Sequence, residues 1–81
     1  MPEIFTTKKL IGIVESDENF SDFITRLSKM STKELGKLVG ATMMFDLQLG
    51  MQIQTPVQKE FVRKNLMLMK EAKNILEERR S

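Results

Sequence analysis

The chain of 81 residues contains no cysteine, histidine, tryptophan or tyrosine. Without cysteine it can form neither a disulfide framework nor a thiolate metal site. Without histidine it lacks the commonest general base and the usual ligand of zinc. No glycine-rich phosphate loop and no separated pair of carboxylates can be recognised either. We therefore expect a protein that is not an enzyme, with no catalytic residue, no metal and no cofactor.

A strong charge of one sign and long apolar runs are also missing. The 13 basic and 11 acidic residues give a net charge of +2, which is too balanced to indicate nucleic-acid binding by charge alone. No apolar run approaches the roughly 18 residues of a membrane span. The N-terminus lacks the basic-then-apolar order of a signal peptide. These features predict a cytoplasmic protein without a membrane span.

Proline and glycine are scarce, with two and four residues, and no linker divides the chain. We expect one helical domain over residues 1–81, with residues 1–5 as a flexible tail. A first helix is expected to start near Thr6 or Thr7, with Phe5 packed on Leu10 as a hydrophobic staple. The β-branched run that follows, Leu10–Val14, leaves a strand as the alternative.

A second helix is expected after a cap at Ser16 or Asp17. Its apolar residues recur at spacings of three and four, which is typical of one helical stripe: Phe20, Phe23, Ile24, Leu27 and Met30. The acidic residues near its start, Asp17, Glu18 and Asp22, favour the positive end of the helix dipole. A metal site is the alternative interpretation, but these ligands are few and adjacent.

Two capping boxes predict the remaining helix starts. Ser31 with Glu34 opens a helix to about Gly50, and Thr55 with Gln58 opens a helix to about Arg79. The last helix carries one apolar side and an i,i+4 pair on its wet side, Glu60 and Lys64. Its apolar side comprises Phe61, Val62, Leu68, Met69, Ala72, Ile75 and Leu76.

These elements predict an all-α, compact bundle of about four helices with a long C-terminal helix. About 24 residues give that helix a length of roughly 36 Å, whereas a compact globule of this size is about 30 Å across. The last helix should therefore overhang the body or pack on a second copy. We expect a homodimer on this ground.

The second half of the third helix is apolar nearly all round, which indicates burial on every side. The other helices are too few to cover it, so we expect another chain to cover the remaining apolar surface. Gly36 and Gly40 suggest a close approach by another helix. Asp46 should reach solvent or pair with a Lys or Arg of another helix. The predicted partner-binding residues are Met44, Phe45, Asp46, Leu47 and Met67, whereas Met30, Met43 and Met69 are assigned to the core.

Two functional hypotheses remain. One is a helical module that binds another protein by apolar contact. The alternative is a small helix-turn-helix-like DNA-binding regulator, with Gly36 at the small-residue position and Gly40 in the turn. The residues that would follow as a recognition helix are apolar or acidic, Met43 to Leu47, so binding of nucleic acid is the weaker hypothesis.

The stretches STKELGKLVGATMMFDLQLGMQ and TPVQKEFVRKNLMLMKEAKNILEERR resemble a family of small accessory proteins of T-even-type phages, the third rapid-lysis protein. The length of 81 residues agrees with that family. The resemblance implies a protein of the host cytoplasm that supports lysis inhibition. Its partners would be the cytoplasmic segment of the phage holin or the antiholin. The resemblance assigns no functional residue.

Overall fold

The computed structural model describes residues 5–50 and 55–80, and every regular element in these ranges is a helix. The helices are α1 (Thr7–Val14), α2 (Asp17–Leu27), α3 (Thr32–Gly50) and α4 (Pro56–Arg80). This confirms the all-α bundle with a long C-terminal helix, and it shows that Leu10–Val14 is helical. Residues 1–4 of the expected tail lie outside the described residues. Phe5 belongs to the core, so a tail cannot extend that far.

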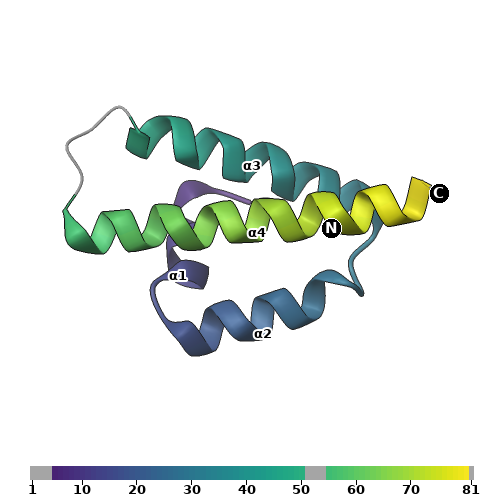
Figure 1. The fold of residues 1–81 in the computed structure, drawn as a ribbon, viewed down its shortest axis with the longest axis horizontal. Coiled ribbons are helices and arrows are strands. Elements are labelled where there is room, and N and C mark those ends of the chain that lie inside the picture. The colour runs from purple at the N-terminus through teal and green to yellow at the C-terminus, as the bar shows by residue number, and fades with distance from the viewer. Residues whose placement is uncertain (1–4, 51–54, 81) are drawn as a thin grey trace.

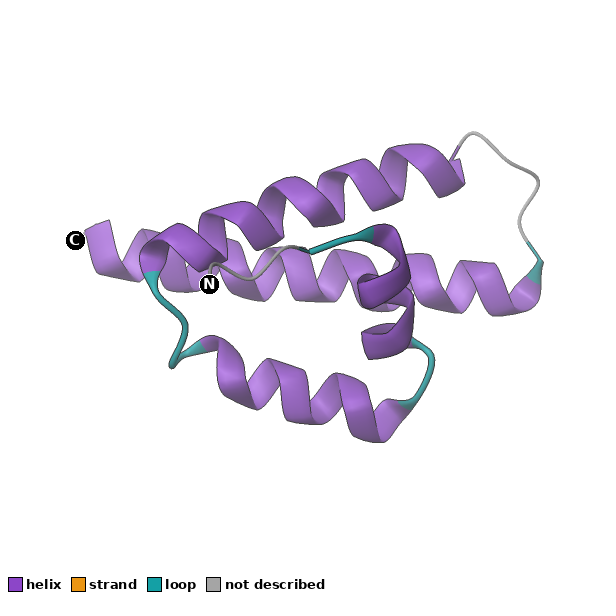
Figure 2. Ribbon diagram, turned by 180° about the vertical axis from the view of Figure 1, so that it is seen from behind, coloured by secondary structure: helices purple, strands orange, loops and turns teal. Residues whose placement is uncertain are grey.

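The helices α3 and α4 form an antiparallel pair, and α2 lies along the opposite side of α4 (Figure 1). The short α1 runs across the back of this layer, where Figure 2 shows it in front of α4. It contacts all three other helices. The molecule measures 39 × 26 × 25 Å. The 25 residues of α4, at 1.5 Å each, span its long dimension, so the length of α4 does not by itself require a second copy.

The helix starts follow the sequence signals residue by residue. The hydroxyl oxygens of Thr6 and Ser16 each accept a hydrogen bond from the backbone N–H three residues later, at 3.2 and 3.1 Å. In the box at Ser31, the backbone N–H of Glu34 donates to Ser31 Oγ and the N–H of Ser31 donates to Glu34 Oε1. The box at Thr55 has the same reciprocal pair with Gln58. Both capping boxes are confirmed.

The core lies where α1 meets the other three helices. Phe5 and Leu10 flank the Thr6 cap and are both buried, as a hydrophobic staple requires. The ring of Phe5 meets Phe23 of α2 edge-on, with centroids 6.2 Å apart. The buried apolar residues are Phe5, Leu10, Ile13, Val14, Phe23, Leu27, Leu35, Leu38, Phe45, Leu68 and Ala72.

The buried side of α4 differs from the predicted stripe in two positions. Leu68 and Ala72 are buried as expected, but Lys64 and Asn65 are buried with them. The expected pair of Glu60 with Lys64 is wrong, because Glu60 binds Arg63 instead. Lys64 points inward and Arg63 points outward, so Glu60 forms its ion pair at a spacing of three rather than four residues.

The C-terminal end of α4 is tied to the connection between α2 and α3. Arg79 donates from one terminal nitrogen to Thr32 Oγ1 and from the other to the carbonyl of Ser28, both at 3.2 Å. The carbonyl of Ser28 lies just past the end of α2, and Thr32 is the first residue of α3. One guanidinium therefore links the end of α4 to both sides of the α2–α3 connection, which lies 47 to 51 residues earlier in the sequence.

Candidate interaction surface

The five predicted partner-binding residues do not lie on one surface. Phe45 is completely buried, so its assignment to a partner-binding surface was wrong. Met44 and Leu47 are 58% and 63% exposed, and Met67 is also exposed. Asp46 is half-buried. It has no ion-pair partner among residues 5–50 and 55–80, so its carboxylate is available to solvent.

Phe45 is buried while its neighbours are exposed because α3 has one buried side, even where its sequence is apolar all round. Residues spaced by three and four along this side pack inward: Leu35, Leu38, Thr42 and Phe45. Met43, which the sequence assigned to the core, is turned away from this side and is 50% exposed. The second half of α3 therefore has apolar side chains that the other helices do not cover, and in the single chain they face solvent.

The exposed large apolar side chains of the described residues all belong to α3 and α4. They are Met43, Met44, Leu47, Val57, Leu66 and Met67. None of them lies on α1 or α2. They concentrate in the second half of α3 and the first half of α4, which run side by side in the antiparallel pair (Figure 1). Of the six, Met43 and Leu47 line one common hollow.

Part of this set borders a hollow in the seam between α3 and α4. Met43, Asp46 and Leu47 line it from α3, and Met69 and Lys73 line it from α4, around a volume of about 240 Å³. Asp46 and Leu47 are the two predicted residues that this hollow brings together.

The sequence analysis missed one further residue on this face, Leu66. Leu66, Met69 and Lys73 recur at spacings of three and four, so they share one side of α4. Leu66 is exposed, so it extends the apolar border of the hollow along α4. The same spacing in the sequence could have found it.

A second hollow continues the seam toward the other end of the pair. It has a volume of about 470 Å³ and is lined by Thr32, Gly36, Lys73, Leu76, Glu77, Arg79 and Arg80. Gly36 and Gly40 are exposed, and a Cβ added to either would meet nothing within 4 Å. The close approach expected at these glycines is therefore not made within the chain.

α1 packs on the opposite side of this seam. Thr7 of α1 donates a hydrogen bond to the side chain of Gln48 on α3, at 3.0 Å. Gln48 lies on the flank of α3 away from Met43 and Leu47, because one residue advances the helix by about 100°. Met43 and Leu47, which line the hollow, thus lie on another flank of α3 than Gln48, which α1 contacts.

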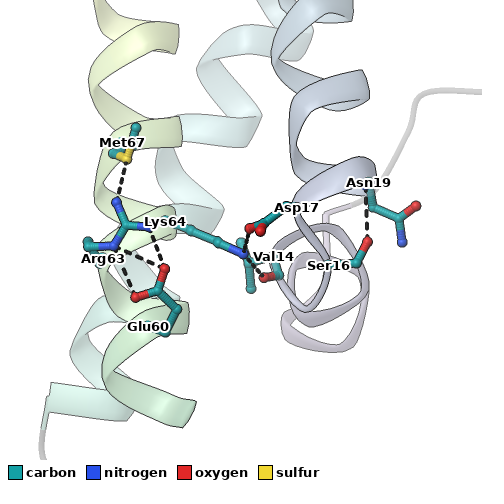
Figure 3. A network of polar contacts seen from close by, with 8 residues as sticks. All are labelled: Val14, Ser16, Asp17, Asn19, Glu60, Arg63, Lys64 and Met67. Atoms are coloured by element: carbon teal, nitrogen blue, oxygen red, sulfur yellow. Dashed lines mark hydrogen bonds and ion pairs between the residues drawn. The ribbon is translucent and has the colours of Figure 1, made fainter. Parts of the chain in front are cut away.

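A polar joint holds α2 and the end of α1 against α4, as Figure 3 shows. The buried ammonium of Lys64 donates to the carbonyl of Val14 at 3.3 Å and pairs with Asp17 Oδ1 at 2.6 Å. It also lies 6.0 Å from the ring centre of Phe20. Val14 is the last residue of α1, so the cation meets the negative end of that helix. This joint is structural, and it leaves Lys64 unavailable to a partner.

The joint makes stability depend on pH through Asp17. The hydrogen bond from Lys64, together with its charge, lowers the pKa of Asp17 below the ordinary value of 3.8. A lowered pKa stabilises the fold above the ordinary value, and this stabilisation is lost as the pH falls through the pKa of the folded state. We expect Asp17→Asn to lower the urea midpoint at pH 7, and the gap from the parent to close below about pH 4.

The control for this prediction is Glu18→Gln, because Glu18 lies in the same first turn of α2 and is exposed. It also removes one charge from the positive end of the helix dipole. Urea titrations followed by circular dichroism at several pH values compare the two variants. Equal midpoint losses in both variants would contradict a specific role of the Lys64–Asp17 pair.

The structure also bears on two alternatives from the sequence. The helix-turn-helix interpretation required a turn at Gly40, but α3 is one uninterrupted helix from Thr32 to Gly50, so this register is wrong. Within the described residues, no three acidic side chains gather in a way that could hold a metal ion. None of the described helices combines the length and the apolar character needed to cross a bilayer.

Searched against protein-family models, curated proteins and solved structures, the chain has no significant match.

Proposed function

We propose that this protein is a non-enzymatic helical module that binds other proteins through the exposed apolar side chains of α3 and α4. The observation that carries the proposal is the confinement of all six exposed large apolar residues in the described ranges to these two helices. Scattered apolar residues are normal on a protein surface, whereas apolar residues that gather, as Met43 and Leu47 do at the hollow between α3 and α4, mark an interaction site.

The chemistry of this set suits a helical or extended protein segment. Three of its six members are methionines, whose flexible thioether chains adapt to irregular partner surfaces. Full burial of each such side chain contributes about 1.5–3 kcal/mol. Charged residues such as Lys73 and Asp46 border it, which gives the apolar centre and polar rim of a protein interface.

The resemblance to the rapid-lysis accessory family supplies the proposed biological partner. In this proposal the protein acts in the host cytoplasm and binds the short cytoplasmic segment of the phage holin, or the antiholin. Binding delays lysis if the bound holin assembly is favoured over the assembly that forms the pore. Such a population shift requires a higher affinity for one holin state than for the other.

The test is a titration of a fluorescently labelled peptide of the holin cytoplasmic segment, followed by anisotropy. We expect saturable binding to the parent protein. The double variant Met44→Ser with Met67→Ser should bind about ten-fold more weakly, which corresponds to about 1.4 kcal/mol. Lys70→Ser is the control, because Lys70 is an exposed, polar position on α4.

Two results would contradict the proposal. One is the absence of any binding to the peptide. The other is an affinity of the double variant equal to that of the Lys70→Ser control, which would show that the exposed methionines make no contact.

A further inference from the structure

Four exposed residues on one side of α3 are spaced symmetrically along the helix, so the spacing reads the same from either end. Gly36, Gly40, Met43 and Leu47 follow each other at four, three and four residues, so they share one side of the helix. Two of them have no side chain, and the other two are large apolar residues that are at least half exposed. We call these four residues the α3 strip.

We propose that the α3 strip is the contact between two copies of this chain, whose α3 helices pack antiparallel about a two-fold axis. The axis passes between Gly40 and Met43. Each Leu47 then lies over the partner's Gly36, and each Met43 lies over the partner's Gly40. This inference rests on the proposed function, since it assigns a second copy to part of the same apolar surface.

The shape of the surface supports this pairing. Gly36 is part of the lining of the 470 Å³ hollow, which Leu76 also lines. Leu47, at 63% exposure, is the most exposed large apolar side chain of the described residues. A two-fold axis therefore places each projecting leucine at the partner's hollow. The open space at both glycines lets the two helix backbones come close, as small residues do at other helix pairs.

The charges on α3 favour the antiparallel order over the parallel one. Lys33, Glu34 and Lys37 give the first half of the helix a net charge of +1, and Asp46 gives its second half a net charge of −1. An antiparallel pair sets the basic half against the half that carries Asp46. A parallel pair would set each lysine beside its own copy and would align the two helix dipoles. The self-complementary spacing and the charge order thus select the same arrangement.

The first experiment measures molecular mass by sedimentation equilibrium across a dilution series. We expect a reversible change between one and two chains. The variant Gly36→Gln with Gly40→Gln should fill the spaces that receive Leu47 and Met43, and dimerisation should weaken at least a hundred-fold. Glutamine is a far better helix former than glycine, and both positions are open in the single chain, so the variant should still fold. Circular dichroism and urea titration check this point.

The control is Met44→Gln, because Met44 lies on α3 next to Met43 but outside the strip. It should leave dimerisation within about two-fold of the parent. A chain that stays monomeric at every concentration would overturn the inference, and so would a glutamine double variant that dimerises like the parent.

The second experiment tests the direction of packing, using the absence of cysteine from the parent chain. Gly36→Cys and Leu47→Cys are made in separate chains and oxidised alone or mixed. We expect the mixture to form at least ten-fold more cross-linked dimer than either variant alone. Cross-linking within each single variant at the level of the mixture would indicate parallel or unspecific contact and would overturn the antiparallel arrangement.

The holin peptide separates failure of this inference from failure of the proposed function. Peptide binding by a strictly monomeric chain would overturn the dimer and leave the proposed function standing. Loss of both self-association and peptide binding would overturn both. Met44 and Met67, whose replacement tests the contact with the peptide, are not members of the strip.

Discussion

Replacement of Phe45 by alanine should destabilise the protein by about 3–5 kcal/mol, as the removal of a fully buried aromatic ring does in other cores. Phe45 is the largest side chain among those that are fully buried. It packs in the core that α3 shares with α1 and α4. A domain of 81 residues has a total stability of about 4–12 kcal/mol. The loss is therefore at least about a quarter of the total stability, and it should lower the urea midpoint of the variant in proportion.

The matched control is Met44→Ala, one residue earlier on the same helix. Met44 is mostly exposed, so its truncation should change the free energy of unfolding by no more than about 0.5 kcal/mol. Urea titrations followed by circular dichroism measure both variants. Similar losses at the two positions would show that α3 does not pack with Phe45 inward, and the description of the candidate surface would then fail.

Replacement of Asn65 by aspartate should be about as damaging, at on the order of 3–5 kcal/mol near neutral pH. Asn65 is fully buried, and its amide donates to the carbonyl of Thr42 at 2.9 Å. The other atom of the amide, Oδ1, is buried and has no hydrogen-bond partner within the described residues. An aspartate here would bury a carboxylate against a carbonyl oxygen, without the donor that charge requires.

The loss at Asn65→Asp should grow with pH, as the loss at Asp17→Asn does, although the two carboxyl groups have pKa shifts of opposite sign. Burial raises the pKa of such a carboxyl above its unfolded value. The penalty is then absent at low pH, where the group is protonated in both states, and grows as the pH rises above about 4. Urea midpoints at several pH values measure this change. A loss that does not vary with pH would contradict a buried, ionised group.

Asn65→Leu is the companion variant, because leucine has a similar branched shape and no polar atom. It removes both the hydrogen bond to Thr42 and the unpaired oxygen. The carbonyl of Thr42 remains and keeps its hydrogen bond within α3, so the lost hydrogen bond and the removed unpaired oxygen should roughly offset, and stability should change by no more than about 1 kcal/mol. A large loss in this variant would mean that Oδ1 has a partner in solution, such as a bound water molecule.

The helix starts could be predicted from the sequence because capping is local. Ser31 and Glu34 satisfy each other's backbone N–H groups within a single turn, so no distant residue changes the outcome. The positions of the helices relative to each other depend on contacts that no local pattern encodes. α1 contacts all three other helices, although its eight residues gave only a helix-or-strand alternative in the sequence.

The candidate surface was predictable in kind but not residue by residue. The apolar excess in the second half of α3 correctly indicated an exposed set. A helix that is apolar all round, however, carries no periodic signal for which side faces the core. For this reason the sequence analysis placed Phe45 on the surface and Met43 in the core, whereas Phe45 is buried and Met43 is exposed. Lys64 was misplaced for a related reason, because a long side chain can bury its stem and reach a distant carbonyl.

The late position of α4 in the chain has a consequence for folding during synthesis. Lys64 reaches back to Val14, and Arg79 reaches back to Ser28, across 50 and 51 residues. Leu35, Leu38 and Phe45 leave the ribosome before α4 does, because α3 precedes α4 in the chain. The nascent chain therefore carries these side chains without their final cover, and the native core closes only when α4 has also emerged.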